Sequence, residues 1–278
     1  MPELPTHTAT RYLQPLREGG SLPAVVDTDG GGLFVVKFRG AGQGPKALIA
    51  ELIVGMLADA AGLPIPQLAL IHVPPPFGRS EPDPEIQDVL RASHGVNVGL
   101  RYLDGAFNYD NIAAGELIDA NLATRVVWLD AYLTNPDRTH RNPNILIWER
   151  KPWLIDHGAA LYVHHDWGSL DDARVRAPFP RIREHVLLER SADPATADAE
   201  MATALSDDRI TSVLAAVPDA LLLDRTRGQE FATGDHARAR YRDYLTARRT
   251  NRQSFVQEIS RARRELRTTT PQRLSARR

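Results

Sequence analysis

Three oxygen-bearing side chains lie within a short stretch in the middle of the chain. Asp137 belongs to the run Asn-Pro-Asp-Arg, Asn142 follows it, and Asp156 ends an apolar run just before His-Gly. Phosphoryl transfer needs a carboxylate beside the attacking hydroxyl, which suits Asp137. It also needs oxygen ligands that hold Mg²⁺ on the nucleotide phosphates, and Asn142 and Asp156 suit that role. The pattern therefore predicts a phosphotransferase that uses a nucleotide and Mg²⁺.

The elements around these residues predict how they come together. The apolar segments 144–148 and 152–156 predict a hairpin, which would fold Asp156 back toward Asn142. An amphipathic pattern over 113–133 predicts a helix, and Asp130 near its end is expected to brace the Asp137 loop through hydrogen bonds. Each piece alone is also typical of an Asx-capped turn or a strand end. The joint arrangement favours the chemical interpretation.

The pattern of secondary structure changes along the chain. The first third predicts mainly sheet with one strong helix, and from about residue 107 the pattern is mainly helical, so the fold class is α+β. The predicted strands are 22–27, 32–39, 67–73 and 97–103, and the predicted helices are 46–61, 84–92, 180–190, 197–216 and 235–266. Weak periodicity over 157–179 predicts a surface loop.

Lysine is rare in this chain, which draws attention to Lys37. Only three of the 34 basic residues are lysines, namely Lys37, Lys46 and Lys151. In a chain so rich in arginine, a lysine indicates a position that requires a compact ammonium rather than a guanidinium. A carboxylate on the following helix, Glu51, would hold such an ammonium in a cleft. The alternation of Phe34 and Val36 against Lys37 equally fits a surface lysine, and Glu51 equally fits a solvated helix position.

A glycine-rich loop precedes the first predicted helix. Backbone N–H groups of Gly42, Gln43 and Gly44 are expected to cradle a phosphate there, and Lys46 in the first helical turn would reach the same anion or the solvent. The loop is neither G-x-G-x-x-G nor a Walker A loop. It is therefore a weaker signal than the Asp137 region.

The run Asn-Pro-Asp-Arg-Thr-His-Arg-Asn-Pro-Asn that starts at Asn135, together with Ile-Asp-His-Gly ending at Gly158, resembles the HipA-like kinase domain family. Three further runs are similar to that family, namely Gly-Pro-Lys-Ala-Leu-Ile-Ala-Glu51, Gly-Leu-Pro-Ile-Pro66 and Arg-Tyr-Leu-Asp-Gly105. The matches span roughly residues 20–165. Asp-His-Gly replaces the Asp-Phe-Gly of most protein kinases, and no Ala-Pro-Glu anchor follows it.

The resemblance implies a bilobal protein-kinase-like fold that binds ATP and Mg²⁺, with an N-lobe over 1–105 and a helical C-lobe over 106–278. It implies that the site residues are Asp137 as the catalytic carboxylate, Lys37 on the α/β phosphates, Glu51 as its partner, and Asn142 and Asp156 as metal ligands. The implied reaction is transfer of the γ-phosphate to a hydroxyl acceptor, first of all a protein serine or threonine. A small-molecule kinase and a non-catalytic nucleotide-binding scaffold stay open as alternatives.

The composition of the chain excludes several classes of protein and of functional site. The chain has 278 residues, 42% of them hydrophobic, and no cysteine, so a disulfide framework or a thiolate metal site is excluded. No long apolar run or signal sequence is present, so a cytoplasmic protein without a membrane partner is expected. A net charge of −1 disfavours nucleic-acid binding by the whole molecule, although the arginine-rich tail over 261–278 is either a solvated end or a partner contact. No H-E-x-x-H spacing points to a histidine metal site, and no G-x-S-x-G elbow points to a hydrolase triad.

Overall fold

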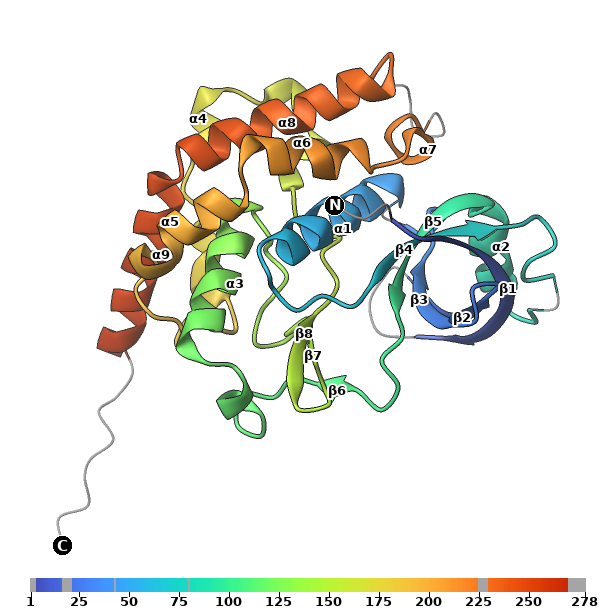
Figure 1. The fold of residues 1–278 in the computed structure, drawn as a ribbon, viewed down its shortest axis with the longest axis horizontal. Coiled ribbons are helices and arrows are strands. Elements are labelled where there is room, and N and C mark those ends of the chain that lie inside the picture. The colour runs from blue at the N-terminus through green and yellow to red at the C-terminus, as the bar shows by residue number, and fades with distance from the viewer. Residues whose placement is uncertain (1–3, 17–21, 43, 80, 225–229, 270–278) are drawn as a thin grey trace, which may run out of the picture.

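A β-barrel lies at one end of the molecule and most of the helices lie at the other (Figure 1). The computed structural model describes residues 4–16, 22–42, 44–79, 81–224 and 230–269. Five strands close the barrel in the order β1-β2-β3-β5-β4, and β1 pairs parallel with β4. These strands are β1 (Thr6–Pro15), β2 (Ala24–Thr28), β3 (Leu33–Lys37), β4 (Leu68–Val73) and β5 (Gly95–Arg101).

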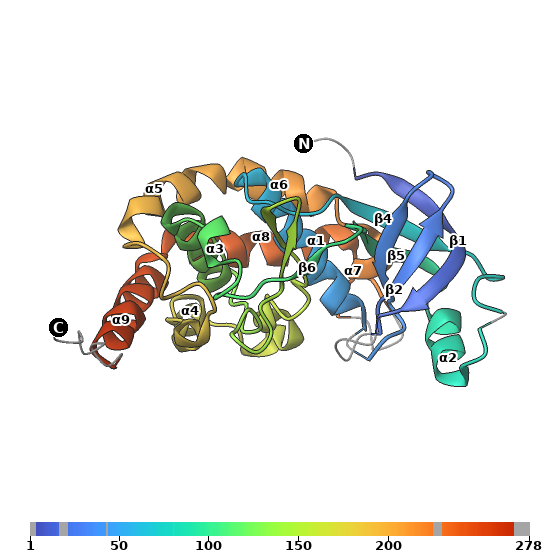
Figure 2. The same cartoon turned by 90° about the horizontal axis from the view of Figure 1, so that it is seen from below.

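The barrel has its own apolar core, which follows from alternation along the strands. Phe34 and Val36 of β3 point inward and are almost fully buried, together with Val26 of β2 and Ile71 of β4. Helix α2 (Pro84–Ala92) closes this core with Leu90 and lies beside the barrel in Figure 2. Asp83 caps α2 by accepting the N–H of Glu85 at 2.9 Å, and a proline at the first position suits the helix start.

Helix α1 (Gly44–Ala60) is apolar around almost its whole circumference. A helix of this kind has to be buried on all sides, and nearly all of its residues are buried. It packs against β4 and β5 of the barrel on one side and against α6 (Asp207–Ala215) and α7 (Asp219–Leu222) on the other. Gly62, with φ of +70°, ends it in a left-handed turn that an L side chain would strain.

The other described elements surround a second, larger core. A small sheet has the order β6-β7-β8, and aromatic rings of Trp128, Tyr132 and Phe255 pack together, the first and last with centroids 5.2 Å apart. Buried Arg248 donates to backbone carbonyls of four residues and so ties three segments together. These elements are β6 (Phe107–Asn108), β7 (Ile145–Trp148), β8 (Lys151–Leu154), α3 (Ala120–Tyr132), α4 (Asp172–Val175), α5 (Ala195–Ala204), α8 (Gly234–Thr250) and α9 (Gln253–Thr269).

The mixed α and β character predicted from the sequence is confirmed, but several helix boundaries were wrong. The helix predicted over 113–133 begins only at Ala120, because Asp119 caps it by accepting the N–H of Leu122 at 2.7 Å. The helix predicted over 197–216 is broken between α5 and α6, where Ser206 caps the second helix. The helix predicted over 235–266 likewise divides at the turn between α8 and α9.

Other segments were also assigned wrongly. Residues 180–190 contain only a short 3₁₀ helix, Pro180–Glu184, instead of an α-helix. The segment 157–179 is not a surface loop, because it contains short helices and buries Trp167 and Phe179 in the larger core. Strands β1 and β6 were not predicted, and residues 270–278 of the basic tail lie outside the described part of the chain.

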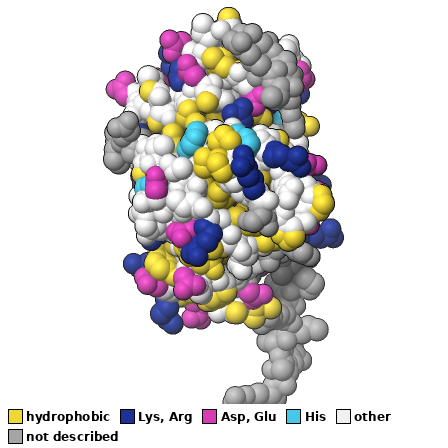
Figure 3. Space-filling model, turned by 90° about the vertical axis from the view of Figure 1, so that its right-hand side faces the viewer, with side chains coloured by type: hydrophobic (Ala, Val, Ile, Leu, Met, Phe, Trp, Pro, Cys, Tyr) yellow, Lys and Arg dark blue, Asp and Glu magenta, His cyan; other side chains and the backbone are white. Residues whose placement is uncertain are grey.

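The surface at the barrel end carries basic and acidic side chains interspersed with apolar ones (Figure 3), as expected for a chain of net charge −1. No helix in the described part of the chain is both long enough and apolar enough to cross a membrane.

Candidate active site

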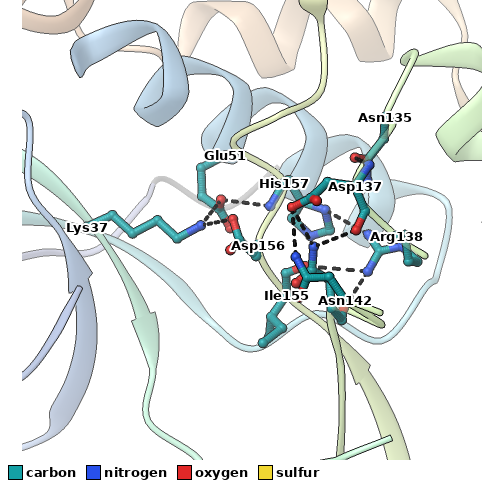
Figure 4. A network of polar contacts seen from close by, with 10 residues as sticks. Lys37, Glu51, Asn135, Asp137, Arg138, Asn142, Ile155, Asp156 and His157 are labelled. Atoms are coloured by element: carbon teal, nitrogen blue, oxygen red, sulfur yellow. Dashed lines mark hydrogen bonds and ion pairs between the residues drawn. The ribbon is translucent and has the colours of Figure 1, made fainter. Parts of the chain in front are cut away.

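Lys37 leaves β3 on the face opposite Phe34 and Val36, which is the outside of the barrel. Glu51 of α1 and Asp156 contact the side chain there, and Lys37 is only 8% exposed rather than solvated. Its Nζ lies 2.6 Å from Glu51 Oε2 and 2.6 Å from Asp156 Oδ1 (Figure 4). Burial disfavours the ammonium, but the two carboxylates outweigh burial and raise the pKa of Lys37.

Glu51 connects three segments from the middle of α1. Its side chain is fully buried, and its Oε2 accepts both the Lys37 ammonium and the backbone N–H of His157, the latter at 2.8 Å. Its Oε1 is buried without a hydrogen-bond partner among the described residues. Glu51 therefore fixes β3 and the segment after β8 against one helix.

Asp156 lies two residues beyond the end of β8. Its φ is +54°, a left-handed conformation that aspartate tolerates better than most residues. The side chain is 41% exposed, so one edge of the carboxylate remains accessible while Oδ1 contacts Lys37. Partial burial raises the pKa of Asp156, but the Lys37 ammonium outweighs burial and holds the pKa below its usual value.

Asp137 is held by two amides that follow it in the chain. Its Oδ2 accepts the Nδ2 of Asn142 at 2.9 Å and the Nδ2 of Asn144 at 3.2 Å. Because an ionised carboxylate only accepts hydrogen bonds, the nitrogen of each amide must face Asp137. The oxygen of Asn142 is left without a donor among the described residues, as is Oδ1 of Asp137.

A buried ion pair lies beneath the Asp137 loop. Arg138 is 1% exposed, and its Nε donates to Asp130 Oδ2 at 2.6 Å. The same carboxylate accepts from Asn135 and from His185 Nε2, both at 2.9 Å. Burial disfavours the Asp130 carboxylate, but Arg138 and His185 outweigh it and hold the pKa of Asp130 well below its usual range. The brace expected from Asp130 is confirmed.

His157 links this brace to the Lys37 group. Arg138 Nη2 lies 3.2 Å from His157 Nδ1, and because arginine only donates, Nδ1 accepts and the imidazole proton is on Nε2. Burial lowers the pKa of His157 to about 4, so the ring is neutral near pH 7. The two halves of the candidate site, Asp137 with Asn142 and Lys37 with Asp156, thus belong to one hydrogen-bonded network (Figure 4).

The glycine loop and Lys46 are placed differently. The Gly44 N–H donates to the carbonyl of Ala41 at 2.8 Å, so it is engaged within the loop. Gln43 lies outside the described residues, while a side chain at Gly42 would meet open space. Lys46 contacts Glu230 at 2.9 Å and the carbonyl of His164. The structure therefore does not join Lys46 to the network around Lys37.

Sequence reasoning missed four residues of the network, namely Arg138, Asn144, His157 and His185. The first three lie inside the quoted motifs, so their position was a signal even though their contacts were not assigned. His185 has no local signal, because contacts between distant segments, such as the bridge between Thr139 and His185, bring it to the Asp137 loop.

Comparisons with known proteins identify the family and the fold of this chain. A family model described as HipA-like kinase matches residues 10–259. The chain belongs to the HipA-like kinase family. The match confirms the resemblance seen in the motifs, and it extends over the helical part of this HipA-like kinase as well.

One solved structure shows the same fold. The crystal structure of the Helicobacter pylori proinflammatory kinase CtkA is similar to this chain with a TM-score of 0.52 at 12% sequence identity. The alignment covers 95% of this chain and 99% of that one. No curated protein matches the sequence. Family and fold together support a kinase-type phosphotransferase.

Proposed function

We propose that this HipA-like kinase transfers the γ-phosphate of ATP, with Mg²⁺, to a hydroxyl acceptor, most directly a serine or threonine of a protein. The observation that carries the proposal is the position of Lys37 Nζ, 2.6 Å from both Glu51 and Asp156, in the network that also holds Asp137. Phosphoryl transfer depends on positioning and charge neutralisation, which such a network supplies.

We assign Asp137 to the acceptor hydroxyl. The amides of Asn142 and Asn144 engage Oδ2, which leaves Oδ1 for the hydroxyl. As the hydroxyl oxygen forms its bond to the γ-phosphorus, the bond from that phosphorus to the β–γ bridging oxygen breaks and ADP leaves. The hydroxyl proton passes to the Asp137 carboxylate.

The metal ligands in this proposal are Asn142 and Asp156. Both offer oxygen atoms, and Mg²⁺ in nucleotide sites takes one or two protein ligands and completes its coordination with phosphates and water. When bound, Mg²⁺ would neutralise charge on the transferring phosphate. The accessible edge of Asp156 and the unengaged amide oxygen of Asn142 fit such a role.

Lys37 would hold the α- and β-phosphates in the same proposal. A neutral side chain there would leave those charges unopposed, whereas the Glu51 carboxylate keeps the ammonium in one position. Gly42, Gln43, Gly44 and Lys46 remain predicted nucleotide contacts. We further propose that residues 1–105 and 106–278 act as two lobes around the nucleotide.

Two alternatives are less well supported. A non-catalytic scaffold would not need Asp137, Asn142, Asp156, Lys37 and Glu51 together, yet the chain retains all of them in one network. A small-molecule kinase would use the same residues and differs only in the acceptor.

The decisive experiment replaces Asp137 with alanine. We expect phosphate transfer to fall at least about a hundredfold, since the group that orients and deprotonates the hydroxyl is lost, while ATP binding measured by calorimetry stays close to that of the wild type. Asp243→Ala, at an exposed position of α8, is the matched control. Transfer by Asp137→Ala at the wild-type rate would refute the assignment.

A further inference from the structure

Three exposed arginines lie on the two segments that flank Asp137, and we call them the cationic rim. They are Arg141, Arg181 and Arg183. Arg141 directly precedes Asn142, whose amide lies 2.9 Å from Asp137 Oδ2. Arg181 and Arg183 belong to the 3₁₀ helix Pro180–Glu184.

Backbone contacts fix this helix against the Asp137 loop. Thr139 pairs with His185 in an antiparallel bridge, and the N–H of Val186 donates to the carbonyl of Arg138 at 3.1 Å. His185 also reaches the Asp130 carboxylate beneath the loop. The rim segments therefore meet the loop on its Arg138 side, whereas Lys37 lies on the opposite side of Asp137 in Figure 4.

The charge of the rim is poorly compensated. Arg181 and Arg183 share Glu184 as their ion-pair partner, at 3.9 Å each, and their side chains are 60% and 65% exposed. Arg141 is exposed and forms no hydrogen bond or ion pair with any described residue. Ion pairs so long and exposed contribute little. The two segments that meet at the Asp137 loop thus carry three exposed guanidinium groups, with Glu184 as the ion-pair partner of two of them.

We propose that the acceptor is a peptide segment whose serine or threonine is flanked by aspartate or glutamate, and that the cationic rim binds those flanking carboxylates. Arginine is suited to this because its planar donors match a carboxylate in a bidentate way. Uncompensated positive charge beside Asp137 attracts an anionic acceptor and repels a basic one. This inference rests on the kinase function proposed above and adds the class of acceptor.

The test uses the full chain, ATP, Mg²⁺ and three peptides that differ only in the residues flanking one serine. The flanking residues are acidic, neutral or basic. We expect the acidic peptide to show the lowest acceptor KM. An exposed ion pair changes affinity by up to about fivefold, and a reversed charge replaces attraction with repulsion. Arg141→Glu and Arg183→Glu should therefore each raise the KM for the acidic peptide about tenfold, with a much smaller change in the KM for ATP.

Arg242→Glu is the matched control, because Arg242 is an exposed arginine on α8 with a weak 3.6 Å ion pair. The double variant Arg141→Glu/Arg183→Glu should prefer the basic peptide. Preference of the wild type for the neutral or basic peptide would overturn the inference while leaving the kinase function intact. A larger rise in the KM for ATP than for the peptide would also overturn it, because the rim would then serve the nucleotide. Absence of any Asp137-dependent phosphate transfer would instead defeat the proposed function, and the inference with it.

Discussion

Removal of the Lys37 ammonium is expected to destabilise the fold as well as to abolish activity. In Lys37→Met, Glu51 would remain fully buried with a single donor, the His157 N–H at 2.8 Å, and with no opposite charge. Removing one partner of a buried ion pair costs about 3–5 kcal/mol. Because the hydrogen bond from His157 remains, we expect a loss of stability at the lower end of this range, about 3 kcal/mol. Loss of the ion pair with Asp156 adds little to it, because the Asp156 side chain is partly exposed.

A loss of this size is measurable by calorimetry. For a chain of this length, each kcal/mol lowers the melting temperature by about 2–4 °C, so Lys37→Met should melt about 6–12 °C below the wild type. The double variant Lys37→Met/Glu51→Met removes both charges and should recover most of the difference, since an apolar pair of similar volume often replaces a buried ion pair without loss. Phosphate transfer should be lost in both variants, by a factor of about a hundred or more.

Lys151→Met is the matched control, because Lys151 is an exposed lysine at the start of β8. Its melting temperature and phosphate transfer should stay near those of the wild type. If Lys37→Met melts like Lys151→Met, or if the double variant is no more stable than the single one, the buried pair is not the cause of the stability. Undiminished transfer by Lys37→Met would refute the role in phosphate binding.

Two further predictions concern neighbours of these residues. Asn144→Gly keeps the left-handed backbone (φ +49°) but removes one of the two amides that hold Asp137. The kcat should therefore fall about tenfold to a hundredfold while the KM for ATP changes less than about twofold, and equal changes in both constants would contradict a role in positioning. Acidification should lower the free energy of unfolding between about pH 6.5 and 4. In that range the unfolded chain binds a proton on His157. The folded chain does not, because burial has lowered the pKa of His157 to about 4. In His157→Asn, whose oxygen can accept from Arg138, the pH slope of stability measured by urea unfolding should decrease by about one proton, and an unchanged slope would show that His157 is not the group responsible.

The residues of the Asp137 region could be predicted because their signal is local. Asp137, Asn142 and Asp156 lie in short motifs whose residue types suit one chemistry, and the hairpin between them is formed by β7 and β8 as expected. The orientation of Lys37 was harder. Alternation along β3 correctly placed it on the face opposite Phe34, but alternation cannot tell whether water or a helix covers that face.

The features that escaped prediction depend on contacts between distant segments. Apolar periodicity continues across the break at Ser206, because both flanking helices bury one face in the same core, and only the cap marks the division. His185 is recruited to Asp130 through a bridge that no pattern of neighbouring residues announces. Strand β1 escaped because its burial is irregular, with Ala9 its only fully buried residue among those described.

The burial of α1 between the barrel and the helices α6 and α7 limits how the activity of this protein can be regulated. A helix held between the barrel and the pair α6 and α7 cannot swing outward without exposing apolar side chains such as Leu52, Ile53 and Leu57, each of which is fully buried. Exposing three such side chains would cost on the order of 5–9 kcal/mol, comparable with the whole stability of a domain. The folded chain therefore keeps Glu51 in contact with Lys37. In the proposed kinase, control of turnover would then act on the entry of nucleotide or acceptor rather than on the assembly of this ion pair.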